Sequence, residues 1–154
     1  MNWIKLISSI VICQIAGITG SFFTAKNIPV WYAGLKKPVF NPPNWLFAPV
    51  WITLYLLMGV SFYLIWIKSA EKDIKIQVIL FFAQLILNLF WTIIFFGLKS
   101  PGFALFEILI LWILILLCII EFYPVSVTAS ILLIPYILWI TYASILNYSL
   151  WRLN

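Results

Sequence analysis

The sequence predicts an all-α integral membrane protein: a single bundle of five transmembrane helices with an ordered first loop rich in proline and aromatic residues. Hydrophobic residues make up 66% of the 154 residues and charged residues 8%, whereas a soluble domain is about half apolar and one quarter charged. The apolar residues form long runs without strand-type alternation. Because only helices and closed barrels satisfy the backbone in lipid, these runs predict transmembrane helices.

The predicted spans are 19 to 26 residues long, and a helix needs about 20 residues to cross the hydrocarbon layer. They cover residues 4–24, 44–67, 76–98, 102–120 and 125–150. The later connections are short, which predicts antiparallel neighbours and a single domain over residues 1–154. The first span carries Lys5 before its apolar run, as a signal peptide would, but the run is long and four similar spans follow, so we expect the span to be retained.

The charged residues bear on orientation and on partners. Five spans place the termini on opposite sides of the membrane. One side carries Lys26, Lys36, Lys37, Lys99 and Arg152, and the other carries Lys5, Lys68, Lys72 and Lys75. By a margin of one charge, the positive-inside rule predicts a cytoplasmic first loop and C-terminus, and we expect a bacterial cell membrane. Positive charge divided between two faces argues against nucleic-acid binding.

A metal site is not expected. The chain has no histidine, which removes the commonest ligand for zinc and for haem iron. Its two cysteines, Cys13 and Cys118, lie inside predicted spans and are interpreted as small apolar side chains.

Residues 31–51, WYAGLKKPVFNPPNWLFAPVW, contain four prolines and six aromatic residues. Proline cannot continue a helix, but Pro42 and Pro43 can open one, because the first turn has spare N–H groups. Long loops in compact proteins are usually either functional or disordered, and the many aromatic residues argue against disorder. The segment therefore predicts a folded lid over a binding site.

Three predicted spans carry stripes of aromatic and polar side chains at helical spacing. They are Trp51, Tyr55, Met58 and Phe62; Gln84, Asn88, Trp91, Thr92 and Phe95; and Tyr136, Trp139, Ala143 and Asn147. Such stripes would hold a flat aromatic ligand with polar edges. The alternative is interhelical packing with Asn and Gln hydrogen bonds, and the residues alone leave both open.

Glu107 is an acidic residue inside the fourth predicted span. Ionisable groups in hydrocarbon are functional candidates by default, so Glu107 could serve as the proton site of a small proton-coupled exporter. The alternative is a packing residue that pairs with a hydroxyl or amide on a neighbouring helix, or a group close enough to the membrane interface to stay hydrated. We favour the alternative, because no intramembrane Lys or Arg faces Glu107.

Two further patterns concern packing and lipid. Small residues recur at four-residue spacing in the first span, which predicts close helix packing either within the chain or between protomers. They are Ala16, Gly17, Gly20 and Ser21. Near the C-terminus, Leu146, Tyr148 and Arg152 fit a proposed cholesterol pattern, but a Tyr and an Arg are expected at any membrane interface.

Four blocks of sequence carry a family resemblance over nearly the whole chain. They are WYxxLxKPxFNPPNWxFxPVW at 31–51, QLxLNxxWTxxFFG at 84–97, ExxxLW at 107–112 and LLIPYxLWxxYAxxLNxxLWxLN at 132–154. On these blocks the chain resembles the translocator protein family, also called tryptophan-rich sensory proteins, peripheral-type benzodiazepine receptors or TspO/MBR. Val39 and Ala48 depart from it where Ser and Gly are common, and Tyr142 replaces a usual Phe.

The resemblance implies a homodimer that binds protoporphyrin IX, haem and benzodiazepine-site drugs between the second, third and fifth spans, under the first loop. Porphyrin or haem would be a ligand, and no cofactor is obligatory. The implied ligand contacts are Tyr32, Trp51, Tyr55, Asn88, Trp91, Thr92, Phe95, Trp139 and Ala143. Some bacterial members are reported to degrade protoporphyrin in light, which would make Trp51 and Trp139 candidate catalytic residues.

Overall fold

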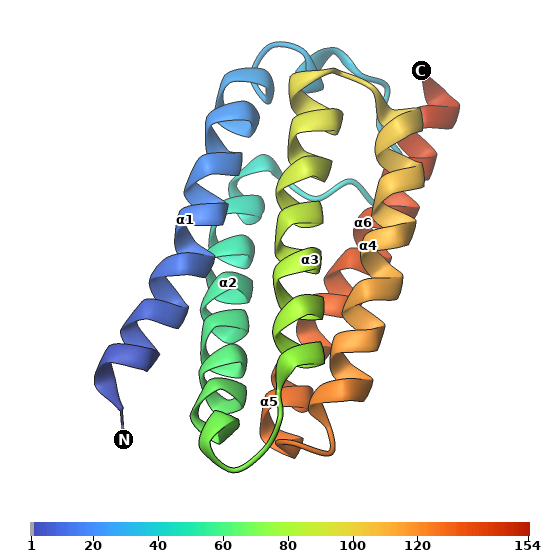
Figure 1. The fold of residues 1–154 in the computed structure, drawn as a ribbon. Helices are drawn as coiled ribbons and strands as arrows, with labels where there is room; N and C mark the ends of the chain where they lie inside the picture. Colours follow the sequence, from blue (N-terminus) through green and yellow to red (C-terminus); the bar gives the residue numbers. More distant parts are fainter. Residues whose placement is uncertain (1) are drawn as a thin grey trace.

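The computed structural model describes residues 2–154 as a bundle of long helices (Figure 1). The helices are α1 (Trp3–Asn27), α2 (Asn44–Trp66), α3 (Lys75–Thr92), α4 (Pro101–Phe122), α5 (Val127–Leu132) and α6 (Ile134–Leu153), with short turns η1 (Tyr32–Gly34), η2 (Ile67–Ala70) and η3 (Ile93–Gly97). Within these described residues, five segments are long and apolar enough to cross a membrane. The predicted all-helical fold is confirmed, and the chain is a multi-pass membrane protein.

The helices pack in a closed order around the bundle: α1 lies along α2 and α3, α3 along α4, α4 along α6, and α2 against α5. The first loop, residues 28–43 between α1 and α2, covers one end of the bundle, where the chain also ends (Figure 1). The Asn154 side chain accepts a hydrogen bond from the Lys36 N–H over 2.9 Å and donates one to the Lys36 carbonyl over 3.0 Å. The first loop and the C-terminus therefore share one membrane face.

Polar side chains and prolines set where several helices begin. The Asn2 side chain accepts a hydrogen bond from the Lys5 N–H at the start of α1, and Ser126 caps α5 in the same way. Pro43 precedes the first residue of α2, and Pro101 is the first residue of α4. Proline is favourable at these positions because its missing N–H would have no helical partner there.

Two local features differ from uninterrupted spans. The fifth span is two helices, α5 and α6, separated at Leu133, because Pro135 has no N–H to donate into the preceding turn. The third span ends in a π-helical turn, η3, in which the Leu98 N–H reaches the Ile93 carbonyl five residues earlier over 2.8 Å. Span length and hydropathy do not reveal either feature.

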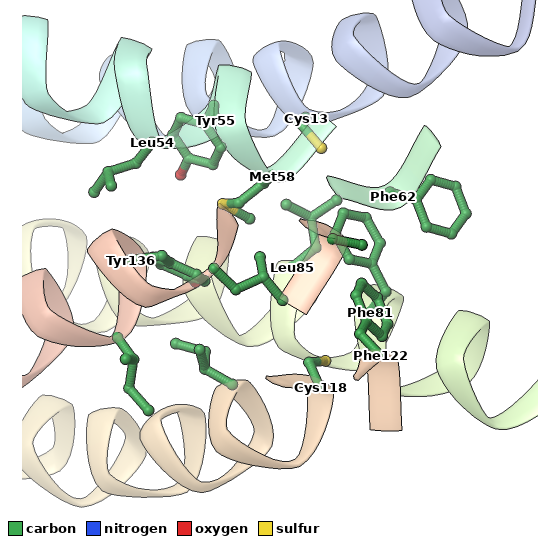
Figure 2. Packing of buried hydrophobic residues seen from close by; sticks show 14 of the residues in the cluster. Cys13, Leu54, Tyr55, Met58, Phe62, Phe81, Leu85, Cys118, Phe122 and Tyr136 are labelled. Carbon is green, nitrogen blue, oxygen red and sulfur yellow. The ribbon is translucent and has the colours of Figure 1, made fainter. Parts of the chain in front are cut away.

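The main core packs buried apolar side chains of α1, α2, α3, α4 and α6 against one another (Figure 2). Phe62 of α2 stacks on Phe81 of α3 with ring centroids 4.5 Å apart, and Phe122 of α4 lies on the other side of Phe81. Cys13 and Cys118 are free thiols buried in this core. The close packing here contrasts with the open space at the loop end.

Candidate ligand-binding site

A cavity of about 420 Å³ lies between α1, α2, α3 and α6, beneath the first loop. Small-molecule sites have volumes of roughly 300–1,000 Å³. Its aromatic walls come from three helices, with Trp51 on α2, Trp91 on α3 and Trp139 on α6. Asn44 and Thr92 add hydrogen-bonding groups to a lining that is otherwise largely apolar. The walls suit a flat hydrophobic molecule with a few polar atoms.

Most of the residues that the family resemblance implied lie together around this cavity. Tyr32, Trp51, Tyr55, Trp91, Thr92, Phe95, Trp139 and Ala143 all line it. Asn88 does not. Its side chain is 2% exposed and lies behind Tyr55, outside the lining.

Asn88 instead belongs to a hydrogen-bonded network below the cavity. The Tyr55 hydroxyl donates to Asn88 Oδ1 over 2.5 Å, and Asn88 Nδ2 donates to the Tyr136 hydroxyl over 2.7 Å. The Tyr136 hydroxyl in turn donates to Gln84 Oε1 over 2.9 Å. Buried polar groups need such partners. Asn88 and Gln84 therefore form hydrogen bonds between helices, which was the alternative to ligand contact. Asn88 also holds the Tyr55 ring that forms part of the cavity wall.

The roof of the cavity is the Tyr32 side chain from η1, which is 2% exposed. Its hydroxyl donates to Asn41 Oδ1 over 2.6 Å, and its ring lies among Phe47, Phe95 and neighbouring rings. The Lys37 ammonium lies 5.0 Å from the Tyr32 ring centroid on the outer side of the loop. Burial raises the pKa of Tyr32 to about 12. The Tyr32 phenol that covers the cavity is therefore neutral at pH 7.

Tyr142 ties the first loop to α6. Its hydroxyl donates to the Phe40 carbonyl over 2.6 Å, and the two rings meet edge to face. The usual Phe of the family pattern could not make this hydrogen bond. The sequence marked Tyr142 as a departure from the family pattern, but the partner is 102 residues away along the chain.

A π turn and a bridging amide shape the α3 wall. Phe95 and Phe96 are adjacent residues within η3. Both are buried, with 2% and 6% of their surfaces exposed. Trp91 stacks on Phe95 at 5.1 Å, and its indole N–H donates to Asn147 Oδ1 over 3.0 Å. Asn147 Nδ2 donates to the Pro101 carbonyl. Asn147 thus joins α3, α4 and α6 around this wall.

The sequence prediction named the second, third and fifth spans and missed the α1 wall. Gln14, Gly17 and Gly20 of α1 line the cavity. A Cβ on Gly17 would lie 2.6 Å from the Tyr55 ring, and one on Gly20 would lie 3.4 Å from Thr92. The small-residue spacing was the available signal. In the structure, Gly17 and Gly20 pack against Tyr55 and Thr92 of the same chain. Of the two alternatives for this spacing, packing within the chain therefore applies at these two positions.

Other candidates from the sequence lie outside the cavity. Glu107 is 6% exposed, and among the described residues neither of its carboxylate oxygens has a hydrogen-bond partner; it does not line the cavity. Leu146 lines the cavity, whereas Tyr148 and Arg152 lie on the exposed surface of α6, so the sterol-pattern residues do not share one face. Within residues 2–154, no group of three potential metal-binding side chains occurs.

Comparisons with known proteins place the sequence in a family. Residues 9–152 match the sequence profile of the TspO/MBR family. The chain is 46% identical to the tryptophan-rich protein TspO of Archaeoglobus fulgidus, over 100% of this chain and 99% of the relative. It is 36% identical to the human translocator protein over 99% and 91% of the two chains. It is 32% identical to the tryptophan-rich sensory protein of Cereibacter sphaeroides over 100% and 94%.

Proposed function

The chain is a member of the TspO/MBR family, and we propose that it is a membrane receptor or transporter for tetrapyrroles such as protoporphyrin IX and haem, and that it also takes benzodiazepine-site drugs. The observation that carries the proposal is the cavity beneath the first loop. Indole rings from three helices surround a space of small-molecule size, and a buried tyrosine covers it. Flat aromatic molecules gain both hydrophobic and stacking energy in such a site.

The charges around the cavity support an orientation for the ligand. The cavity walls carry no ionic side chain, so the tetrapyrrole ring would occupy the space between Trp51 and Trp139. Lys36 and Lys37 lie on the first loop above it. The carboxylates of the ligand would point toward these ammonium groups at the membrane surface, where they stay hydrated. Ionised carboxylates are costly to bury without a partner, which argues against the opposite orientation.

Tryptophan fluorescence in detergent tests the proposal directly. Titration with protoporphyrin IX should give saturable quenching, and Trp51→Ala should weaken the affinity at least about tenfold, because its ring forms part of the wall (about 1.4 kcal/mol). Trp3→Ala is the matched control, since Trp3 lies at the start of α1 and does not line the cavity. The site assignment fails if quenching does not saturate, or if both variants bind as the parent does.

Haem gives a second readout. Because the chain has no histidine, we expect haem to be held through its ring faces and edges, and its absorption spectrum should lack the features of histidine ligation. Cys13 and Cys118 do not line the cavity and are not available as ligands there. A spectrum typical of two histidine ligands would contradict the assignment.

Light-dependent degradation of a bound porphyrin is the second candidate function. Trp51 lies 5.5 Å from Tyr55 and Trp139 lies 5.4 Å from Tyr142, measured between ring centroids. Trp51 and Trp139 would hold the ring and could supply or quench radicals formed on illumination. Binding alone requires the same aromatic walls, so illumination experiments must separate the two functions.

We also propose that the chain forms a homodimer and that its first loop and C-terminus face the cytoplasm. Five positive residues at the loop end favour that orientation, by the narrow margin noted above. Labelling of Lys36 and Lys37 by an impermeant amine reagent, in sealed vesicles of known orientation, tests it. Labelling from the outer face of whole cells would reverse the assignment.

A further inference from the structure

The cavity is open on one side, between α1 and α2. Ile18 of α1 and Ile52 of α2 both line the cavity. Their surfaces are nevertheless 58% and 59% exposed, respectively. Ala25 and Ala48 also line it and are exposed. Residues that face both a cavity and the outside mark its rim. This gap, bounded by Ile18 and Ala25 on α1 and Ala48 and Ile52 on α2, is called the side opening below.

The side opening lies at the depth of the hydrocarbon layer. At 1.5 Å per residue, Ile18 is about 14 Å from the loop end of α1, and Ile52 is about 12 Å from the start of α2. The hydrocarbon layer is about 30 Å thick, so the opening extends from near the membrane surface almost to the bilayer centre. At this depth the side opening would face the lipid chains of the bilayer.

Helix packing explains why the gap occurs at this level. Farther from the loop, α1 and α2 approach so closely that a Cβ on Gly59 would lie 2.7 Å from the Ile10 Cα, and one on Gly17 would lie 2.6 Å from the Tyr55 ring. Toward the loop the rims carry the small side chains of Ala25 and Ala48, which both line the cavity and fill less of the space between the helices than larger residues would.

At the end of the cavity that faces water, the first loop covers the cavity with Tyr32, and the exposed lining residue there is Asn44 at the start of α2. Tyr32 is 2% exposed, and its hydroxyl is bonded to Asn41. The loop around it is held to α6 through Tyr142 and Asn154. A ligand arriving from water would have to displace these contacts, whereas one dissolved in lipid meets an opening.

We propose that ligands enter the cavity sideways, through the side opening, so that the site selects molecules that dissolve in the bilayer. This inference rests on the proposed binding function and adds the class of ligand: hydrophobic ring systems that partition into lipid, with polar groups only at an edge that can remain at the membrane surface. A strongly water-soluble molecule of the same size would have no open path.

A hydrophobic photolabel tests the route without any porphyrin. The protein in lipid nanodiscs is irradiated with adamantyl diazirine, and carbene insertion is mapped by mass spectrometry. Insertion at Phe95, which lines the cavity and is 2% exposed, is compared with insertion at Phe90, which is 50% exposed on the same helix. The Phe95 to Phe90 ratio reports entry from lipid into the cavity.

Ala48→Trp should lower that ratio at least about fivefold by filling the side opening, and Ala25→Trp should do the same from the opposite rim. Leu56→Trp is the control, because Leu56 is exposed on α2 but does not line the cavity; its ratio should match the parent. The proposal is overturned if both rim variants keep the parent ratio, or if a charged, water-soluble diazirine labels Phe95 as readily as the hydrophobic one. Since no porphyrin is present, failure of porphyrin binding cannot produce either result.

Discussion

Gly17 and Gly20 lie one turn apart on α1 and both line the cavity, but they differ in the space available for a methyl group. A Cβ on Gly17 would lie 2.6 Å and 2.7 Å from two carbons of the Tyr55 ring. To restore an ordinary contact of 3.4 Å, ring and helix must separate by about 0.8 Å. The Tyr55 ring cannot simply turn away, because its hydroxyl is bonded to Asn88 and through it to Tyr136.

Gly17→Ala should therefore be less stable than Gly20→Ala by about 1–3 kcal/mol, the usual cost of overpacking. A Cβ on Gly20 would meet Thr92 at 3.4 Å, an ordinary contact. Both variants gain the same helix propensity of up to about 1 kcal/mol from Gly to Ala, so that gain cancels in the comparison. Gly17→Ala should also weaken ligand affinity, because Tyr55 is part of the wall.

Thermal unfolding of both variants in the same detergent, followed by circular dichroism at 222 nm, measures the difference. The midpoint should fall in Gly17→Ala and stay level or rise in Gly20→Ala. Equal midpoints would mean that α1 can shift away from Tyr55 at no cost, and the assignment of α1 as a fixed wall of the cavity would be wrong.

The remaining predictions concern the loop, the chemistry and the buried acid. Replacing Pro42 and Pro43 with Gly should weaken porphyrin affinity with the helical circular dichroism signal intact, because a looser unbound loop costs more entropy to close; equal hydrogen exchange of the loop amides with and without porphyrin would instead identify a fixed wall. Under illumination, the complex should lose porphyrin absorbance faster than free porphyrin in empty micelles if the protein is a photo-oxidative enzyme, with Trp51→Phe and Trp139→Phe reducing the rate; loss at the micelle rate leaves binding alone. Glu107→Gln should leave affinity unchanged from about pH 5 to 8, because Glu107 does not line the cavity; loss of binding or of its pH dependence would revive the proton-coupled exporter.

Much of the fold could be predicted because membrane spans are a matter of length and hydropathy. The boundaries of the first four spans differ from the helices by only a few residues. The division of the fifth span at Leu133 depends on a single proline, and prolines also occur within unbroken helices, as Pro49 does in α2. Sequence spacing could place Pro135 but could not distinguish these two outcomes.

The candidate site was predictable in composition and less so in layout. Helical spacing put Asn88 and Trp91 on one face of the third span, but it could not say that Tyr55 and Tyr136 would occupy the Asn88 amide. The α1 wall was missed because Gly17 and Gly20 have no side chain to suggest a ligand contact. Which groups a residue meets across the bundle depends on helix depth and rotation, and one sequence does not specify these.

The π turn at the end of α3 has a consequence for how this helix tolerates insertions and deletions. A π turn holds one more residue than an α-helical turn between the same two points, so η3 is equivalent to a one-residue insertion into a helix. Deleting one residue within 93–97 would return the turn to α geometry without shortening the span that the membrane requires. Because the two end points stay in place, the segments before and after the turn would keep their relative rotation, whereas deleting one residue elsewhere in α3 would rotate them by about 100° and turn Trp91 away from the cavity. The number of residues between Trp91 and the turn, as well as their identity, keeps the aromatic wall facing the cavity.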